Sequence, residues 1–480
     1  MNNETSDNSF VVNLEANALH RKNAIEFAIK HISTDKRIIV VDGLDPQDNA
    51  MIQAVLSRDP KSVLPHLEKL KKEGSGKIMG LFYVGYGHGS IGQCGHTTIF
   101  FENVSMLVAK AVQDSIMYIG QESSTRYLNM SLQATKNPAG TIFGENLQKE
   151  SMDFYEQILA DLIPELTARF PMPEHNETDV DKIQRKVTDY KKSIKAKAFD
   201  IARGFLPAGV TTYVSWHTSL QNAKKQLDYL TQHPVAEVSV LATQAMQAMK
   251  EVYPESFGHK EHPEQTVYLA HLAGKYAYWD LKYDSFSILK NTLSPHELCQ
   301  YEELMTKRPE YAELPSFLNE CGQIRATFPL DFGSFRDMQR HRPWVNKMPL
   351  LHTDFGFFEW YLEQLPQVLR NRAEKHLEKF EANLQEIKLS REELQNYILM
   401  GYTVQTQTTG GLPQYVYVCE LRTKQTVHPT FRKPEQQMAT YLQEWFKENV
   451  GFDLPLYVNM DTDEFSTKRG TQDIVKKEVI

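Results

Sequence analysis

Residues 332–342, with the sequence FGSFRDMQRHR, decide our interpretation of the chain. A segment typical of a short helix ends there in Arg340, His341 and Arg342. The two guanidinium groups offer forked hydrogen-bond donors that fit a phosphate or an imide carbonyl. The histidine between them can carry or release a proton near neutral pH. The stretch therefore predicts an anion or nucleotide site directly after a helix.

A second polar stretch, residues 121–127 with the sequence QESSTRY, lies far upstream. Ser124 and Arg126 are two residues apart, which places both side chains on one side of an extended segment. A hydroxyl and a guanidinium in this arrangement are again suited to anion recognition. The alternative is a surface loop with a salt-bridged arginine. We interpret the two stretches as complementary halves of one kind of nucleotide site.

The size and charge of the chain limit the classes of protein to which it can belong. Its 480 residues exceed one ordinary core, so two domains or repeats are expected. A net charge of −8 argues against a general nucleic-acid binder, but it allows a local basic pocket. The four cysteines form no CxxC pair, so zinc and redox motifs have little support. Without a signal pattern or a membrane-length apolar run, we expect a cytoplasmic protein that binds no nucleic acid and no membrane.

The hydrophobic pattern predicts both helices and strands. Residues 19–32 show helical periodicity, and residues 37–42 are typical of a buried strand. The five glycines of residues 85–96 predict tight turns or a close approach of the backbone to another group. A loop-like stretch near residues 250–262 marks the main domain boundary. Further elements are expected as a strand at 97–101 and as helices at 60–74, 105–117, 145–170, 179–197, 210–250, 295–307 and 358–389. Ser105 can cap the helix at 105–117.

On these motifs, the chain resembles the flavin-dependent thymidylate synthases, the thymidylate-synthase-complementing proteins. The signature of that family is Arg-His-Arg, followed by Ser-x-Arg-Tyr about ten residues downstream of the first arginine. The second half of this chain keeps residues 340–342, but the same offset lands on Leu350, His352 and Thr353. The first half keeps residues 124–127, but Asp114 stands where Arg-His-Arg should begin. Each half thus keeps the part that the other has lost.

Other segments resemble the family as well. His88 and Ser90 are similar to a segment that lines the flavin, although Gln93 stands in the place of its usual acid. Ala202-Arg203 followed by Leu206-Pro207 is also similar to a family segment. Asp337 stands where the family usually has glutamine. A late arginine-bearing helix of the family is matched, with imperfect spacing, by Arg422, His428 and Arg432.

The resemblance implies an α+β fold of two tandem domains, residues 1–250 and 251–480, each with a mixed sheet packed against long helices. Active sites of the family lie at subunit interfaces of a homotetramer. A fused pair of domains could therefore form one composite site from both halves, and a homodimer of tandem chains would take the place of the tetramer.

The resemblance further implies reductive methylation of dUMP to dTMP by an FAD-dependent enzyme, with methylenetetrahydrofolate and NADPH as co-substrates. The alternatives are a related flavoenzyme acting on another pyrimidine nucleotide, or a non-catalytic relative whose arginines form structural ion pairs. No metal is expected. The implied residues are Arg340, Arg342 and Arg126 for catalysis, Ser124, Arg126 and Arg432 for the substrate, and His88, Ser90, Gln93, Arg340, His341, Arg422 and His428 for the cofactor.

Overall fold

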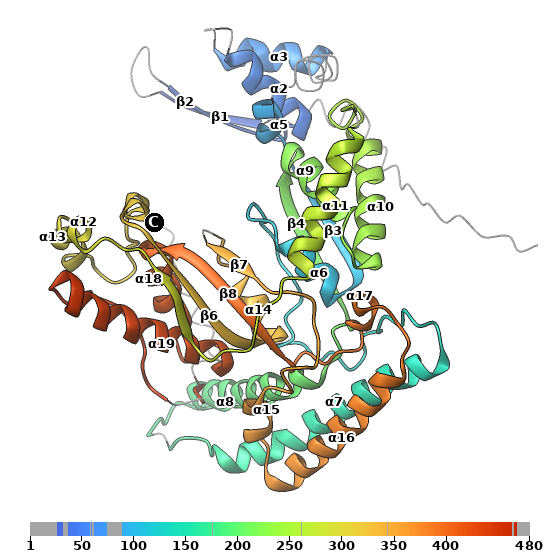
Figure 1. Cartoon of the computed structure of the whole chain (residues 1–480). Coiled ribbons are helices and arrows are strands. Elements are labelled where there is room, and N and C mark those ends of the chain that lie inside the picture. Colours follow the sequence, from blue (N-terminus) through green and yellow to red (C-terminus); the bar gives the residue numbers. More distant parts are fainter. Residues whose placement is uncertain are drawn as a thin grey trace, which may run out of the picture. The chain divides into compact units, whose positions relative to one another are not determined.

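In the computed structural model, helices and short antiparallel strands alternate along the chain, which confirms the expected α+β class (Figure 1). The structure describes residues 26–31, 37–57, 59, 62–73, 89–174, 176–260, 262–342, 344–462 and 465–467. The chain divides into two compact units. Unit 1 comprises Met1–Thr98, His217–Leu227 and Gln244–His262, and unit 2 comprises Ile99–Trp216, Asp228–Thr243 and Pro263–Ile480.

Unit 1 contains an antiparallel hairpin of β1 (Glu26–His31) and β2 (Arg37–Asp42). The expected strand at 37–42 is confirmed, whereas the helix expected over 19–32 is wrong for residues 26–31. These residues pair along their full length with β2, and this pairing outweighs their helical periodicity. The described part of the glycine-rich run contains a short helix, α5 (Gly89–Cys94), where tight turns were one expectation. The other expectation, a close backbone approach, is confirmed at Gly95, where a Cβ atom would lie 2.3 Å from the backbone oxygen of Pro46. The other helices of this hairpin region are α2 (Pro46–Leu56) and α3 (Val63–Glu73).

A two-stranded sheet pairs β3 (His96–Ser105) with β4 (Thr211–Ser219). Ser105 ends the strand and caps the next helix, α6 (Met106–Gln113), because its hydroxyl accepts a hydrogen bond from Val108 N. This cap was expected, but β4 was not, since residues 210–250 were predicted as helical. The helical part of that stretch is α9 (Leu220–Leu230) and α10 (Ala236–Val252).

The largest sheet of unit 2 has four antiparallel strands in the order β5-β6-β8-β7. Its centre is the pair β6 (Gln323–Asp331) and β8 (Thr403–Gly411), which are in register from Gln323 opposite Gly411 to Asp331 opposite Thr403. Helices α18 (Leu412–Arg422) and α19 (Pro429–Trp445) pack along this pair (Figure 1). The edge strands are β5 (Ser287–Asn291) and β7 (Val345–Lys347).

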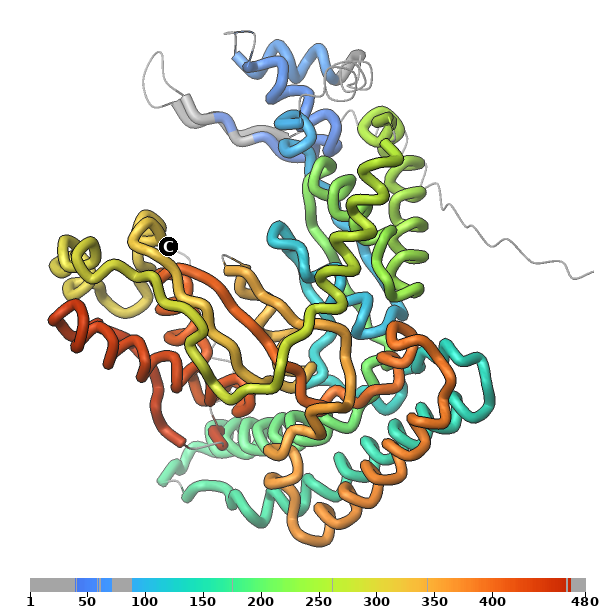
Figure 2. Tube along the Cα trace, in the orientation of Figure 1, coloured from blue at the N-terminus to red at the C-terminus, as the bar shows by residue number. Residues whose placement is uncertain are grey.

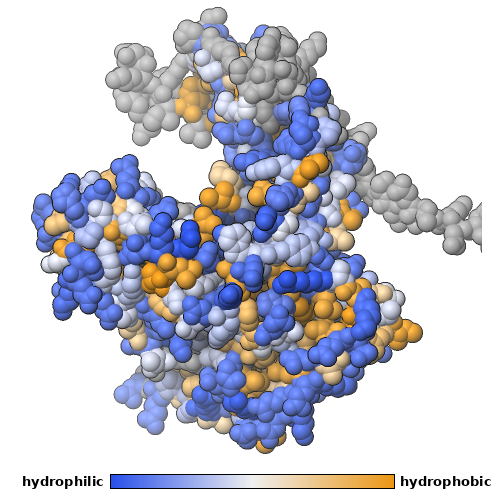
Figure 3. Space-filling view, viewed as in Figure 1, coloured by the Kyte–Doolittle hydropathy of each residue, from blue (hydrophilic) through white to orange (hydrophobic). Residues whose placement is uncertain are grey.

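Long helices complete unit 2, and α7 (Ile142–Arg169) runs beside α16 (Gln367–Glu386) (Figure 2). The buried residues of α16 are Leu369, Ala373, Leu377, Phe380 and Leu384, whose spacing of three and four residues forms one apolar face. Hydrophilic residues line the outer side of these helices (Figure 3). Pro366 separates α16 from α15 (Glu359–Glu363), so the single helix expected at 358–389 is wrong.

The remaining elements of unit 2 are shorter, apart from α8 (Val180–Ala202) and α11 (Pro263–Ala277). The expected helix at 295–307 is present as two short helices. No helix in the described residues is both long enough and apolar enough to span a membrane. These shorter elements are η2 (Arg203–Phe205), α12 (Pro295–Cys299), α13 (Glu302–Thr306), η3 (Ser316–Cys321), α14 (Phe332–Met338), α17 (Arg391–Leu394) and η4 (Phe446–Val450).

The order of elements repeats along the chain. A strand and helix (β3-α6, β6-α14) precede a long helix (α7, α16), and a second strand and two helices follow (β4-α9-α10, β8-α18-α19). The segments that lead into the second strands also bond to each other, since Ala208 N donates to Ile398 O at 2.8 Å and Met400 N donates to Leu206 O at 2.7 Å. This order supports a tandem repeat, which we retain as a proposal with the bounds 1–250 and 251–480.

Candidate functional site

Helix α14 positions the Arg-His-Arg stretch. Asp331 caps the helix, because its Oδ1 accepts a hydrogen bond from Ser334 N at 2.9 Å. The helix is almost wholly buried, so the chain emerges from the core at a fixed place after Met338. Arg340 is exposed there, whereas the intervening His341 is 5% exposed.

A pocket of about 660 Å³ lies beside these residues. Arg340, His341, Arg342, Trp344 and Tyr417 contribute charge and aromatic surface to its lining. Several buried donors here have no hydrogen-bond partner in the described part of the chain, namely Nε and Nη2 of Arg342 and Nε1 of Trp344. The Arg340 side chain likewise forms no hydrogen bond or ion pair with described residues. Free guanidinium donors beside aromatic rings suit a planar ligand that carries an anionic group.

His341 is neutral in this environment. Burial, together with the neighbouring Arg422, lowers its pKa to about 3. Its Nε2 accepts a hydrogen bond from Arg422 Nε at 2.7 Å, so the proton of the neutral ring lies on Nδ1. Arg422 Nη2 also donates to the carbonyl oxygen of Asp337 at 3.1 Å. His341 and Asp337 therefore hold the Arg422 guanidinium in place.

The loop of residues 121–127 reaches the same region from the first half of the chain. Arg126 is 9% exposed, and its Nε and Nη2 donate to the two carboxylate oxygens of Asp200 at 2.8 and 3.2 Å. Ser124 Oγ accepts a hydrogen bond from Arg126 N at 3.3 Å, which shapes the turn. Both residues thus adopt a fixed geometry, and Asp200 orients Arg126.

Asp337 links the two stretches. Its Oδ2 lies 4.0 Å from Arg126 Nη1 and 3.9 Å from Arg203 Nη1. Burial would raise the pKa of Asp337, but Arg126, Arg422, Arg203 and Arg340 outweigh burial, so its pKa is lowered. The sequence expectation that both stretches serve one region thus has a geometric counterpart, with an ionised carboxylate at its centre.

A buried ion pair fastens the loop to the helix. Arg336 Nη2 on α14 donates to Glu122 Oε1, and the Glu122 and Arg336 side chains are 1% and 6% exposed. Gln113 Nε2 donates to the other oxygen of Glu122 at 2.6 Å. Because both charges are buried and paired, the relative position of loop and helix is strongly constrained.

Some predicted residues lie elsewhere. His88 is outside the described residues, and Ser90 and Gln93 are exposed on α5 of unit 1. His428 is fully buried, with Nε2 bonded to Asp200 O at 3.1 Å. Arg432 is also buried, and its Nε donates to Thr423 O at 2.7 Å. The last two side chains are engaged with the protein itself.

Sequence reasoning assigned no role to Asp200, Asp331 or Tyr361. Arg203 Nη2 donates to Ser334 Oγ at 2.8 Å and lies 3.4 Å from Asp331 Oδ1, and Tyr361 OH donates to the same carboxylate atom at 2.8 Å. Arg203 carried a signal, since it was part of a family-like segment. Asp200 carried none, because it lies just after the charged helix expected at 179–197 and belongs to no motif.

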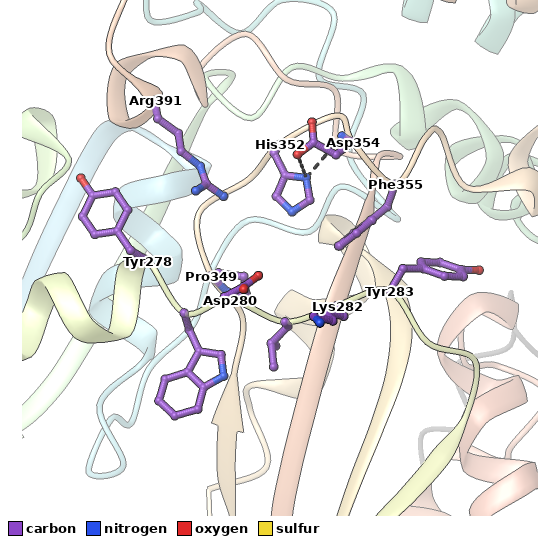
Figure 4. Close-up of a pocket in the computed structure, with 11 residues that line it drawn as sticks. Tyr278, Asp280, Lys282, Tyr283, Pro349, His352, Asp354, Phe355 and Arg391 are labelled. Carbon is purple, nitrogen blue, oxygen red and sulfur yellow. Dashed lines mark hydrogen bonds and ion pairs between the residues drawn. The ribbon is translucent and has the colours of Figure 1, made fainter.

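A second pocket of about 400 Å³ lies at the place where the second half has lost its Ser-x-Arg-Tyr (Figure 4). His352 and Arg391 point into it, and Asp354 N donates to His352 Nδ1 at 3.3 Å. Its acidic residues, Asp280 and Asp354, balance its basic residues, Lys282 and Arg391. The pocket therefore offers no net charge to an ionic ligand. Among the described residues, no three histidine, cysteine, aspartate or glutamate side chains gather in a way that could hold a metal ion.

Comparison with known proteins identifies one matching family model and two relatives of low sequence identity. Residues 40–255 match the family model described as thymidylate synthase complementing protein. A UPF0159 protein of Chlamydia pneumoniae is 24% identical over 405 residues, which are 72% of this chain and 74% of the relative. A UPF0159 protein of Chlamydia muridarum is 23% identical over 419 residues, 74% of this chain and 76% of the relative. The family match contains the loop of Arg126 and ends before Arg340.

Proposed function

We propose that the chain, whose residues 40–255 match the family model of the thymidylate synthase complementing proteins, is an FAD-dependent, thymidylate-synthase-like enzyme. The reaction would be reductive methylation of dUMP to dTMP, with methylenetetrahydrofolate and NADPH as co-substrates. The observation that carries the proposal is the approach of Arg126 from the first half to Asp337 beside Arg340 from the second. One composite site would then use the motif part that each half has kept.

The pocket beside α14 fits a flavin or another planar anionic ligand. Arg340 and Arg342 carry unused guanidinium donors toward it, and Trp344 and Tyr417 supply ring surfaces. In our proposal these residues hold the cofactor. The cofactor roles of His88, Ser90 and Gln93 rest on the resemblance alone. When bound and reduced by NADPH, FAD would supply the hydride, and the protein would orient the reactants and exclude water.

The nucleotide would be held by Ser124 and Arg126. A guanidinium close to the uracil carbonyl stabilises the negative charge that develops when the ring is attacked, and Arg126, Arg340 and Arg342 are our candidates for this role. Neutral His341 positions Arg422 through the bond to its Nε. We propose that His428 and Arg432 act as positioning residues, since both are bonded to the protein. A homodimer of tandem chains in the cytoplasm completes the proposal.

The first test is the visible absorption spectrum of the purified chain after incubation with FAD and removal of the excess. We expect flavin bands at near-stoichiometric amounts, followed by NADPH oxidation that depends on dUMP. Arg340→Ala should lose the bound flavin, whereas Arg391→Ala, which removes an exposed arginine at the second pocket, should keep it.

The outcomes separate the alternatives. A folded but colourless protein would contradict the proposal and favour the non-catalytic alternative, in which the arginines form structural ion pairs. Flavin binding with NADPH oxidation that is indifferent to dUMP would favour a flavoenzyme acting on another pyrimidine nucleotide.

A further inference from the structure

Two guanidinium groups converge on one carboxylate oxygen in the candidate site. Arg126 Nη1 and Arg203 Nη1 lie 4.0 and 3.9 Å from the same atom, Asp337 Oδ2. Both distances exceed a hydrogen bond, so the charges attract while the donors stay unused. Neither Nη1 atom donates a hydrogen bond to any residue in the described part of the chain.

The other donors of both arginines are occupied, which fixes the direction of the free ones. Arg126 uses Nε and Nη2 for Asp200, and its Nη2 also donates to Thr426 O at 3.0 Å. Arg203, which is 1% exposed, uses Nη2 for Ser334 and Asp331. Two preorganised donors aimed at one point form a receptor for an oxyanion.

Asp337 acts as the anion of this receptor. The pKa of its carboxyl is lowered because the surrounding arginines outweigh the effect of burial, so it is ionised at neutral pH. A phosphate oxygen placed between the two Nη1 atoms would lie next to this carboxylate and would be repelled by it. An uncharged amide at position 337 would remove that repulsion and leave both arginines in place.

We infer that Asp337 is a built-in anion that occupies the Arg126–Arg203 receptor and weakens its binding of phosphate monoesters. The inference rests on the proposed function, because that function places the nucleotide at Arg126. Asp337 is then a specificity-determining residue. It keeps the dianionic phosphate of the nucleotide away from the inner end of the site and leaves that end for the uncharged base.

The test is a calorimetric titration of the full chain with inorganic phosphate. We expect Asp337→Asn to bind phosphate at least tenfold more tightly than the wild type. Asp153→Asn removes the same charge from an exposed position on α7, where it pairs with Lys149, and should change the affinity less than twofold. Adding Arg126→Lys to Asp337→Asn should abolish the gain, since lysine lacks the forked donors.

An unchanged phosphate affinity in folded Asp337→Asn would overturn the inference, and so would an equal gain in Asp153→Asn. Should Asp337→Asn fail to fold, Asp337→Glu keeps the charge and must bind phosphate as weakly as the wild type; tighter binding would overturn the inference. The titration needs neither flavin nor turnover. A colourless protein can therefore still show the gain, and an active flavoenzyme without the gain would defeat this inference alone.

Discussion

At the scale of the residue, the arginines of the candidate site differ in what they do for the fold. Arg340 is exposed and has no partner among described residues, so Arg340→Ala should change the free energy of unfolding by less than about 0.5 kcal/mol. Arg126→Ala would leave the buried Asp200 without its bidentate partner, at a cost of about 3 kcal/mol. Urea unfolding measures both values. Equal effects would show that Asp200 is satisfied without Arg126.

His341 gives a prediction on pH. Because its folded pKa of about 3 lies below the unfolded value near 6.5, its contribution to stability is complete above pH 6.5 and is lost as the pH falls toward 3. The loss amounts to about 2 kcal/mol between pH 6.5 and 5. His341→Gln keeps an acceptor for Arg422 and does not titrate, so its free energy of unfolding should fall by about 2 kcal/mol less over this range. Identical pH profiles from urea unfolding would contradict a neutral His341.

At the scale of the element, features set by neighbouring residues were predicted from the sequence more reliably than the pairing of strands. The cap at Ser105 and the strand at residues 37–42 follow from neighbouring side chains, and both are present. Strand β4 was missed because its partner β3 lies far upstream in the chain. Residues 26–31 were missed although their partner β2 follows directly, because their periodicity alone indicates a helix. The same limit applies to the site. Arg126 and Arg340 carried motif signals, but Asp200 became visible only through its contact with Arg126.

The segments that lead into β4 and β8 are hydrogen-bonded to each other, and their close contact depends on Gly209. A Cβ atom at this position would lie 2.5 Å from the backbone oxygen of Asn396, so Gly209→Ala should destabilise the protein by about 2 kcal/mol. Gly274→Ala is a control with the opposite sign. A Cβ there meets nothing within 4 Å, and alanine on helix α11 should stabilise by about 0.5 to 1 kcal/mol. Thermal unfolding measures the stability of both variants. An unchanged stability of Gly209→Ala would mean that the segments that lead into β4 and β8 separate easily.

At the scale of the whole molecule, unit 2 combines residues from both proposed repeats around one core. Buried side chains from Met106 to Val210 share a hydrophobic cluster with buried side chains from Leu293 to Leu454. The Glu122–Arg336 pair joins the same two parts of the chain. We therefore expect the two parts of unit 2 to unfold as one cooperative body, although the proposed boundary near residue 250 would allow separate domains.

Hydrogen exchange on Glu122→Gln tests this expectation. Loss of the carboxylate leaves the buried Arg336 unpaired, at a cost of about 3 kcal/mol, so amides that exchange only by global unfolding should exchange roughly a hundredfold faster. The increase should appear equally in α8 and in α19, which lie on opposite sides of the proposed boundary. Glu150→Gln breaks an exposed pair with Lys379 that also connects the two parts, and it should change exchange little. Faster exchange in α8 alone would show that the two repeats fold independently, and a composite site would then depend on the docking of two separately stable domains.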